Sequence, residues 1–115
     1  MNPNLSLRQL RAFEAVAEDG SFTRAAQRLF LTQSALSVLI REVEKELGVL
    51  LFDRSTRRVE LTEAGREFLP DVRRVLNGLS DAVSRIGELR DNRRGVLRGA
   101  ASQLIPSPLT PTVRA

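Results

Sequence analysis

The chain has 115 residues, a formal net charge of +4, 42% hydrophobic residues and 28% charged residues, a composition that favours one small globular domain with an appendage. Cysteine and histidine are absent, which excludes disulfides, thiol catalysis, iron–sulfur clusters and the usual zinc ligands, so we expect neither enzymatic activity nor a bound cofactor or metal. We also expect no membrane span and no secretory signal, because no apolar run has the required length or pattern.

The first predicted helix is marked at both ends. Ser6 and Gln9 have the spacing of a capping box, which predicts that the helix starts directly after Ser6. Gly20 suits a left-handed turn and predicts that the helix ends at Asp19. One apolar stripe at helical spacing comprises Leu7, Leu10, Phe13 and Ala17.

Two further helices are predicted between residues 21 and 48. Ser21 and Thr32 are candidate N-caps, and Gly48 is a candidate stop for the third helix. Only Phe30 and Leu31 separate the second helix from the Thr32 cap, and such a tight joint predicts the steep crossing of a helix-turn-helix. The inward-facing positions are Phe22, Ala25, Ala26 and Leu29 in the second helix, and Leu36, Ile40, Val43 and Leu47 in the third.

The pattern changes after Gly48. Two short strand-like segments, residues 50–52 and 59–61, flank a polar stretch, which predicts a small β-hairpin, or wing. Thr62 then caps a helix predicted over residues 62–91, in which Pro70 should produce a kink. A 3.5-residue apolar repeat in this helix predicts lengthwise packing on a partner, hence dimerisation. Its members are Phe68, Val72, Val75, Leu79, Ala82, Ile86 and Leu89.

The helix signal ends at Asn92. We predict a hinge at residues 93–95, and residues 96–100 have the pattern of one strand without a visible mate. Pro106, Pro108 and Pro111 exclude a helix in the last stretch. Residues 92–115 are therefore expected to be a hinge and a poorly ordered segment.

The basic residues are unevenly placed. All of the 18 are arginines except Lys45, a bias that a GC-rich genome also produces, while guanidinium groups suit phosphate and base contact. Residues 20–41 and 54–59 contain arginines and no acid, whereas three glutamates lie between them at residues 42–46. Two basic patches flanking an acidic one argue against a uniform solvated coat.

The third helix has a polar face opposite its core positions. Gln33, Ser37 and Arg41 are spaced by four residues and are flanked by Ser34 and Val38. A solvated stripe is the ordinary interpretation of such a face. The preceding basic helix, the uncharged N-terminal end and the acids confined to the C-terminal half favour insertion into a DNA groove.

Other candidates lie beside this face. Arg24 and Arg28 share one side of the second helix, and Arg57 and Arg58 lie at the tip of the predicted hairpin. Each pair is explained either by solvent exposure or by contact with DNA, with a wing arginine in a narrow minor groove as the sharper hypothesis. Helix starts such as that at Thr32 can also receive a phosphate on free amides.

Four motifs occur in order between about Leu7 and Leu69: SFTRAAQRL, TQSALS, LGVLLFDR and LTEAG. This stretch resembles the N-terminal domain of LysR-type transcriptional regulators. The resemblance implies a mostly α winged helix-turn-helix with a small β-hairpin, followed by a long dimerisation linker helix. It also implies a cytoplasmic bacterial regulator that binds an interrupted palindrome in promoter DNA as a homodimer, or as a higher oligomer at full length. The DNA-binding candidates are Ser21, Thr23, Arg24, Thr32, Gln33, Ser34, Ser37, Val38, Arg41, Arg54, Arg57 and Arg58.

The resemblance has limits. Many family members carry a polar or basic pair where this chain has Val38 and Leu39, so Val38 would meet a thymine methyl or simply pack. Residues 95–107 resemble the start of an effector-binding domain, and Ser102 resembles an inducer-binding position, but the rest of that pocket is absent from this sequence. A small-molecule inducer is expected only where that domain is present.

Two other functions remain open. In the first, the long helix is a protein–protein interaction module and the winged part is vestigial; the acid-free basic segments argue for DNA binding instead. In the second, the chain is a catalyst, but no nucleophile–base pair supports it. Its carboxylates, at Glu42, Glu44, Glu46 and Glu63, lie on predicted polar helix faces or at a helix start, where solvated roles are the default.

Overall fold

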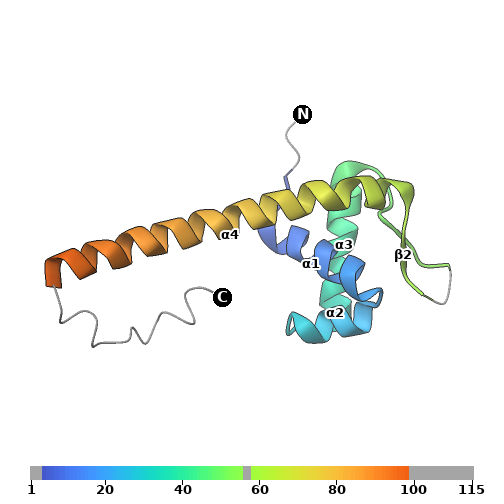
Figure 1. Ribbon diagram of the computed structural model, residues 1–115. Coiled ribbons are helices and arrows are strands. Elements are labelled where there is room, and N and C mark those ends of the chain that lie inside the picture. The colour runs from blue at the N-terminus through green and yellow to red at the C-terminus, as the bar shows by residue number, and fades with distance from the viewer. Residues whose placement is uncertain (1–3, 56–57, 99–115) are drawn as a thin grey trace. The chain divides into compact units, whose positions relative to one another are not determined.

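The computed structural model describes residues 4–55 and 58–98 (Figure 1). These residues form two units, of which one ends at Leu76 and the other begins at Asn77. The first unit holds three helices, a hairpin and the first turns of the last helix, and the second unit holds the remainder of that helix. In chain order the elements are α1 (Leu7–Asp19), α2 (Phe22–Arg28), α3 (Gln33–Leu47), β1 (Phe52–Asp53), β2 (Glu60–Leu61) and α4 (Glu63–Arg98).

The predicted helix caps are confirmed. The side chains of Ser6, Ser21 and Thr32 each accept a hydrogen bond from the backbone N–H three residues on, and Ser6 completes a capping box. Gly20 and Gly48 end α1 and α3 in the left-handed region, with φ of 61° and 74°. Each cap satisfies backbone groups that a helix end leaves unpaired, so the helix boundaries follow from short-range sequence.

The core of the first unit surrounds Phe13, which is fully buried. Its ring centroid lies 5.4 Å from that of Phe52 and 5.3 Å from that of Phe68, while Phe22 meets Phe52 edge-on at 5.8 Å. Aromatic pairs at such distances add to the stabilisation that burial alone provides. These rings join α1, α2, the hairpin and the first turns of α4 around one centre. From α3 the core receives Leu36, Ile40 and Val43.

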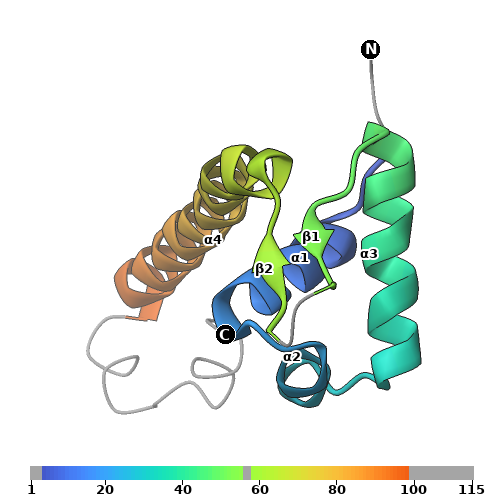
Figure 2. The same cartoon turned by 90° about the vertical axis from the view of Figure 1, so that its right-hand side faces the viewer.

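The hairpin is present, with strands that differ from the predicted ones. β1 and β2 pair antiparallel, Phe52 opposite Leu61 and Asp53 opposite Glu60, and Figure 2 shows them between α3 and the first turns of α4. The predicted strand at residues 50–52 is wrong in its first two residues, and the predicted strand at residues 59–61 is wrong in Val59. The Leu51 N–H donates to Glu44 and the Leu50 carbonyl accepts from the Thr62 hydroxyl, so these backbone groups are engaged outside the strand pair.

The last helix is longer than predicted. The expected end at Asn92 is wrong, because α4 continues to Arg98 and includes both the predicted hinge at residues 93–95 and the first part of the predicted strand. A single Gly95 costs only about 1 kcal/mol relative to alanine inside a helix, and no proline follows Pro70 before Pro106. Residues 99–115, including Ser102 and the three prolines, lie outside the described residues. Within the described ranges, no helix has both the length and the apolar character needed to cross a membrane.

Candidate nucleic-acid interface

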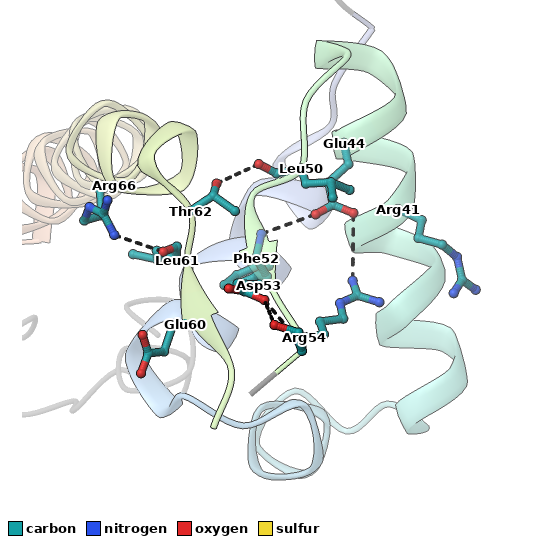
Figure 3. A pocket seen from close by; sticks show the side chains of 11 residues that line it. Arg41, Glu44, Leu50, Phe52, Asp53, Arg54, Glu60, Leu61, Thr62 and Arg66 are labelled. Carbon is teal, nitrogen blue, oxygen red and sulfur yellow. Dashed lines mark hydrogen bonds and ion pairs between the residues drawn. The ribbon is translucent and has the colours of Figure 1, made fainter. Parts of the chain in front are cut away.

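The polar face of α3 points outward. The opposite side of the helix is buried, while Gln33, Ser34 and Arg41 are exposed and Ser37 is half-buried. Val38 is 45% exposed, which confirms its predicted outward orientation. Figure 3 shows the Arg41 side chain extending away from the hairpin. The face is therefore available along the length of the helix.

The first turns of α2 and α3 lie together. The Thr23 hydroxyl donates to the Gln33 side-chain oxygen at 3.4 Å, which places the start of α2 beside the start of α3. Neither first turn contains an acidic residue, and Thr23, Arg24 and Thr32 are exposed there. The two helix N-termini and one arginine thus form a surface with positive potential, which suits an anion such as a phosphate.

Arg28 is committed to α1 instead of this surface. Its guanidinium lies 3.3 Å from Glu18 and 3.2 Å from Asp19, and it also donates to the Ala15 carbonyl at 3.3 Å. The hydrogen bond to Asp19 raises the pKa of Arg28 above its ordinary value. Within the described ranges Arg24 forms no such salt bridge. Arg28 therefore ties α2 to the end of α1, a role that neither sequence interpretation anticipated.

Glu44 is a buried carboxylate, which corrects the expectation of a solvated one. It is 7% exposed, and its Oε2 accepts hydrogen bonds from the N–H groups of Leu51 at 2.8 Å and Phe52 at 3.4 Å. Its Oε1 lies 3.9 Å from an Arg54 guanidinium nitrogen (Figure 3). The position four residues after buried Ile40 is the sequence signal that identifies this side as inward-facing. Glu44 connects α3 to the hairpin.

Arg54 is held at the base of the hairpin from two sides. Besides facing Glu44, its guanidinium carbon lies 4.5 Å from the centre of the Phe22 ring, a cation–π geometry. The side chain remains 38% exposed. The hydroxyl and the N–H of Ser55 donate hydrogen bonds to the Asp53 carboxylate, and these hydrogen bonds lower the pKa of Asp53. Arg58 is exposed on the other side of the tip, and Arg57 lies outside the described residues.

An open hollow of about 720 Å³ lies between α3 and the hairpin (Figure 3). Arg41, Arg54 and Arg66 line it together with an equal number of carboxylates, and Arg66 already donates to the Leu61 carbonyl at 3.0 Å. These charges balance one another. The hollow therefore offers no concentrated charge for a small ionic ligand.

The predicted dimerisation stripe divides into two parts. Phe68 packs against the core of its own chain and Val72 is only 2% exposed, so these two members are covered without a partner. A heptad pattern does not distinguish a partner helix from the chain's own core. Val75 is 51% exposed in the first unit. Among residues 77–93 of the second unit, the exposed large apolar residues are Leu79, Val83, Ile86 and Leu89, with Ala82 half-buried among them.

Comparison with known proteins identifies a regulatory family. The protein-family model described as "Bacterial regulatory helix-turn-helix protein, lysR family" matches residues 7–66 of the sequence. The chain is 42% identical over 108 residues to the HTH-type transcriptional regulator YfeR of Shigella flexneri, covering 94% of this chain and 35% of YfeR. It is 43% identical over 102 residues to the RuBisCO operon transcriptional regulator of Allochromatium vinosum, covering 89% and 34%. The chain therefore spans about a third of the length of the curated relatives it matches.

Solved structures show the same architecture. The BenM DNA-binding domain in complex with catB site 1 DNA has a TM-score of 0.73 and 37% identity, and the match covers 75% of this chain and 97% of that one. The OxyR C206 mutant of Corynebacterium glutamicum has a TM-score of 0.72 and 35% identity, over 76% of this chain and 28% of that one. The predicted winged helix-turn-helix fold is thus confirmed.

Proposed function

This chain belongs to the lysR family of bacterial regulatory helix-turn-helix proteins, and we propose that it binds a specific double-stranded DNA site as a homodimer. In this proposal α3 enters the major groove, an arginine of the wing reaches the minor groove, and two copies occupy an interrupted palindrome. The observation that carries it is the exposed, acid-free start of α3 beside the equally acid-free start of α2. The absence of acidic residues from this surface suits the negatively charged backbone of DNA.

Base reading is assigned to the outward face of α3. Gln33 has the donor and acceptor needed for a bidentate pair with adenine, and Ser37 can contact several bases. Val38 offers an apolar surface to a thymine methyl. All three side chains lie on the side of α3 away from the core, where Gln33 and Val38 are exposed and Ser37 is half-buried. Their spacing along one helix face suits neighbouring base pairs.

Phosphate contact is assigned to Arg24, the capped starts of α2 and α3, and the wing. Arg54 is the described wing arginine with a fixed position and an exposed part. A narrow minor groove concentrates negative potential and attracts such a side chain. Arg58 is exposed two residues before β2 and is assigned to the same contact, while the assignment of Arg57 to the minor groove rests on the sequence alone.

Single substitutions separate the two parts of this affinity. After the preferred site has been selected from a pool of random duplexes, titrations at several salt concentrations should show that Arg24→Ala weakens binding to all sequences. The slope of log affinity against log salt concentration should flatten by roughly one, because each neutralised phosphate contributes about 0.9.

Gln33→Ala should lose about ten-fold in affinity for the selected site, equivalent to about 1.4 kcal/mol, and far less in affinity for random DNA.

Lys45→Ala is the matched control for these titrations. Lys45 is exposed in the last turn of α3, at the acidic end that we expect to lie outside the groove. Its loss should leave the salt slope as it is in the wild type. An unchanged slope in Arg24→Ala would remove Arg24 from the phosphate contacts, and equal losses in Gln33→Ala would move Gln33 from the bases to the backbone.

The homodimer is assigned to the exposed apolar residues of α4 in the second unit. In sedimentation velocity experiments the full chain should dimerise, and Leu79→Arg should shift it to monomers by placing a charge in the seam. Ser84→Arg adds the same charge on the polar side of the helix and should leave the dimer intact. Normal dimerisation of Leu79→Arg would show that the seam lies elsewhere.

A further inference from the structure

Phe30, in the turn between α2 and α3, combines two unfavourable features. It is 94% exposed, the largest value among the exposed large hydrophobic residues of the described chain. Its φ is 58°, and it is the one non-glycine residue in the described ranges with a positive φ. A bulky side chain in the left-handed region is strained, and such strain persists where the surrounding structure enforces it and gathers at functional positions.

The turn does not need a phenylalanine. Its backbone is fixed by hydrogen bonds from the N–H of Phe30 to the Gln27 carbonyl at 3.2 Å and from the N–H of Leu31 to the Ala26 carbonyl at 2.9 Å. Glycine or asparagine adopts the required φ with less strain. Leu31, not Phe30, packs against the core. Neither the fold of the turn nor the core therefore explains the ring.

The position of Phe30 indicates what the ring contacts. It precedes the Thr32 cap by two residues and Gln33 by three, and residues 20–41 contain no acid that would repel a phosphate backbone. Because Phe30 lies before the helix starts, it lies beside the base-reading face of α3 and not on it. At the border of a groove, the carbon surface of deoxyribose is the part of DNA that an apolar ring can pack against.

We propose that Phe30 packs against the deoxyribose of the DNA strand that borders the major groove entered by α3. The proposal rests on the proposed function and adds to it an uncharged contact that does not depend on sequence. The strain and the exposure of Phe30 in the free protein are then tolerated because the ring becomes covered in the complex. The contact removes no counterion, so it differs in its salt dependence from the arginine contacts.

Phe30→Asn tests this contact through three measurements on the full chain. The melting temperature should rise, because asparagine relieves the backbone strain. Affinity for both selected and random duplexes should fall about ten-fold, about 1.4 kcal/mol, at each salt concentration, while the salt slope stays that of the wild type. Phe30→Tyr retains the ring and should retain affinity. Leu50→Asn removes another exposed apolar side chain, 66% exposed beyond the opposite end of α3, and should bind as the wild type does.

The outcomes are distinguishable from one another. Failure of the wild type to bind DNA in a salt-dependent manner would overturn the proposed function itself. If the wild type binds DNA and Phe30→Asn binds it with the same affinity, only the Phe30 contact would be overturned. A loss confined to the selected site would assign the ring to a base in place of deoxyribose, and a change in self-association without a change in affinity would assign it to a second copy; both would overturn the proposal.

Discussion

Gly65→Ala should destabilise the first unit by about 3 kcal/mol, the upper part of the usual range for overpacking a core. Gly65 lies in the first turn of α4, where an added Cβ would collide with the carbonyl oxygen of Leu51 and lie 2.7 Å from Cδ2 of Leu61. The Leu51 carbonyl cannot retreat freely. It accepts from the Thr62 N–H at 3.0 Å, and the N–H of the same residue is held by Glu44.

Urea unfolding followed by circular dichroism measures this effect. Gly78→Ala is the matched control, because nothing lies within 4 Å of its added Cβ and alanine favours a helix interior by about 1 kcal/mol over glycine. The control should therefore be as stable as the wild type or more stable. A Gly65→Ala protein within about 1 kcal/mol of the wild type would show that the hairpin moves away from α4 at little cost.

The second large effect is expected from Glu44→Ala, which should lose about 3 kcal/mol of unfolding free energy. The substitution leaves the buried N–H groups of Leu51 and Phe52 without their acceptor, and each unsatisfied buried group costs about 1–3 kcal/mol. It also removes the carboxylate that faces Arg54. Glu44→Gln keeps an acceptor oxygen and should lose less.

Glu46→Ala provides the control, because Glu46 is an exposed glutamate two residues along the same helix. Its effect on the same urea transition should stay within about 0.5 kcal/mol, as for surface positions in general. If Glu44→Ala and Glu46→Ala were equally stable, the two hydrogen bonds to the hairpin would contribute nothing to the fold. A smaller loss in Glu44→Gln than in Glu44→Ala would assign the effect to those hydrogen bonds.

The parts of this fold that depend on neighbouring residues could be predicted from the sequence. The caps at Ser6, Ser21 and Thr32 act over three residues, so their spacing alone identified the helix starts. The glycine stops were equally local. The outward face of α3 followed from helical periodicity, since its core positions left one side of the helix free.

The features that depend on distant residues could not be predicted. β1 begins at Phe52 and not at the predicted residue 50, because the backbone groups of residues 50 and 51 form hydrogen bonds with Thr62 and Glu44. Arg28 reaches acids on α1, and Val72 reaches the core of its own chain. Periodicity identifies which side of a helix is apolar, but it does not name the surface that covers it.

Several DNA-binding candidates remain predictions for physical reasons. Exposure places Arg24, Gln33 and Val38 where DNA can reach them, yet the same exposure is compatible with solvation. What favours contact is the absence of nearby acids and the pairing of two helix starts, both properties of a surface and not of single residues.

The fixed position of Arg54 has a consequence for the entropy of complex formation. A long side chain that becomes immobilised on binding loses rotamer freedom worth about 0.5–1.5 kcal/mol. Arg54 is already restricted between Glu44 and Phe22 before any DNA arrives, so most of that loss belongs to folding. If the wing meets DNA as proposed, it does so preorganised, and calorimetry should show a smaller entropic penalty than in a Phe22→Leu variant, in which the aromatic ring no longer restricts the arginine.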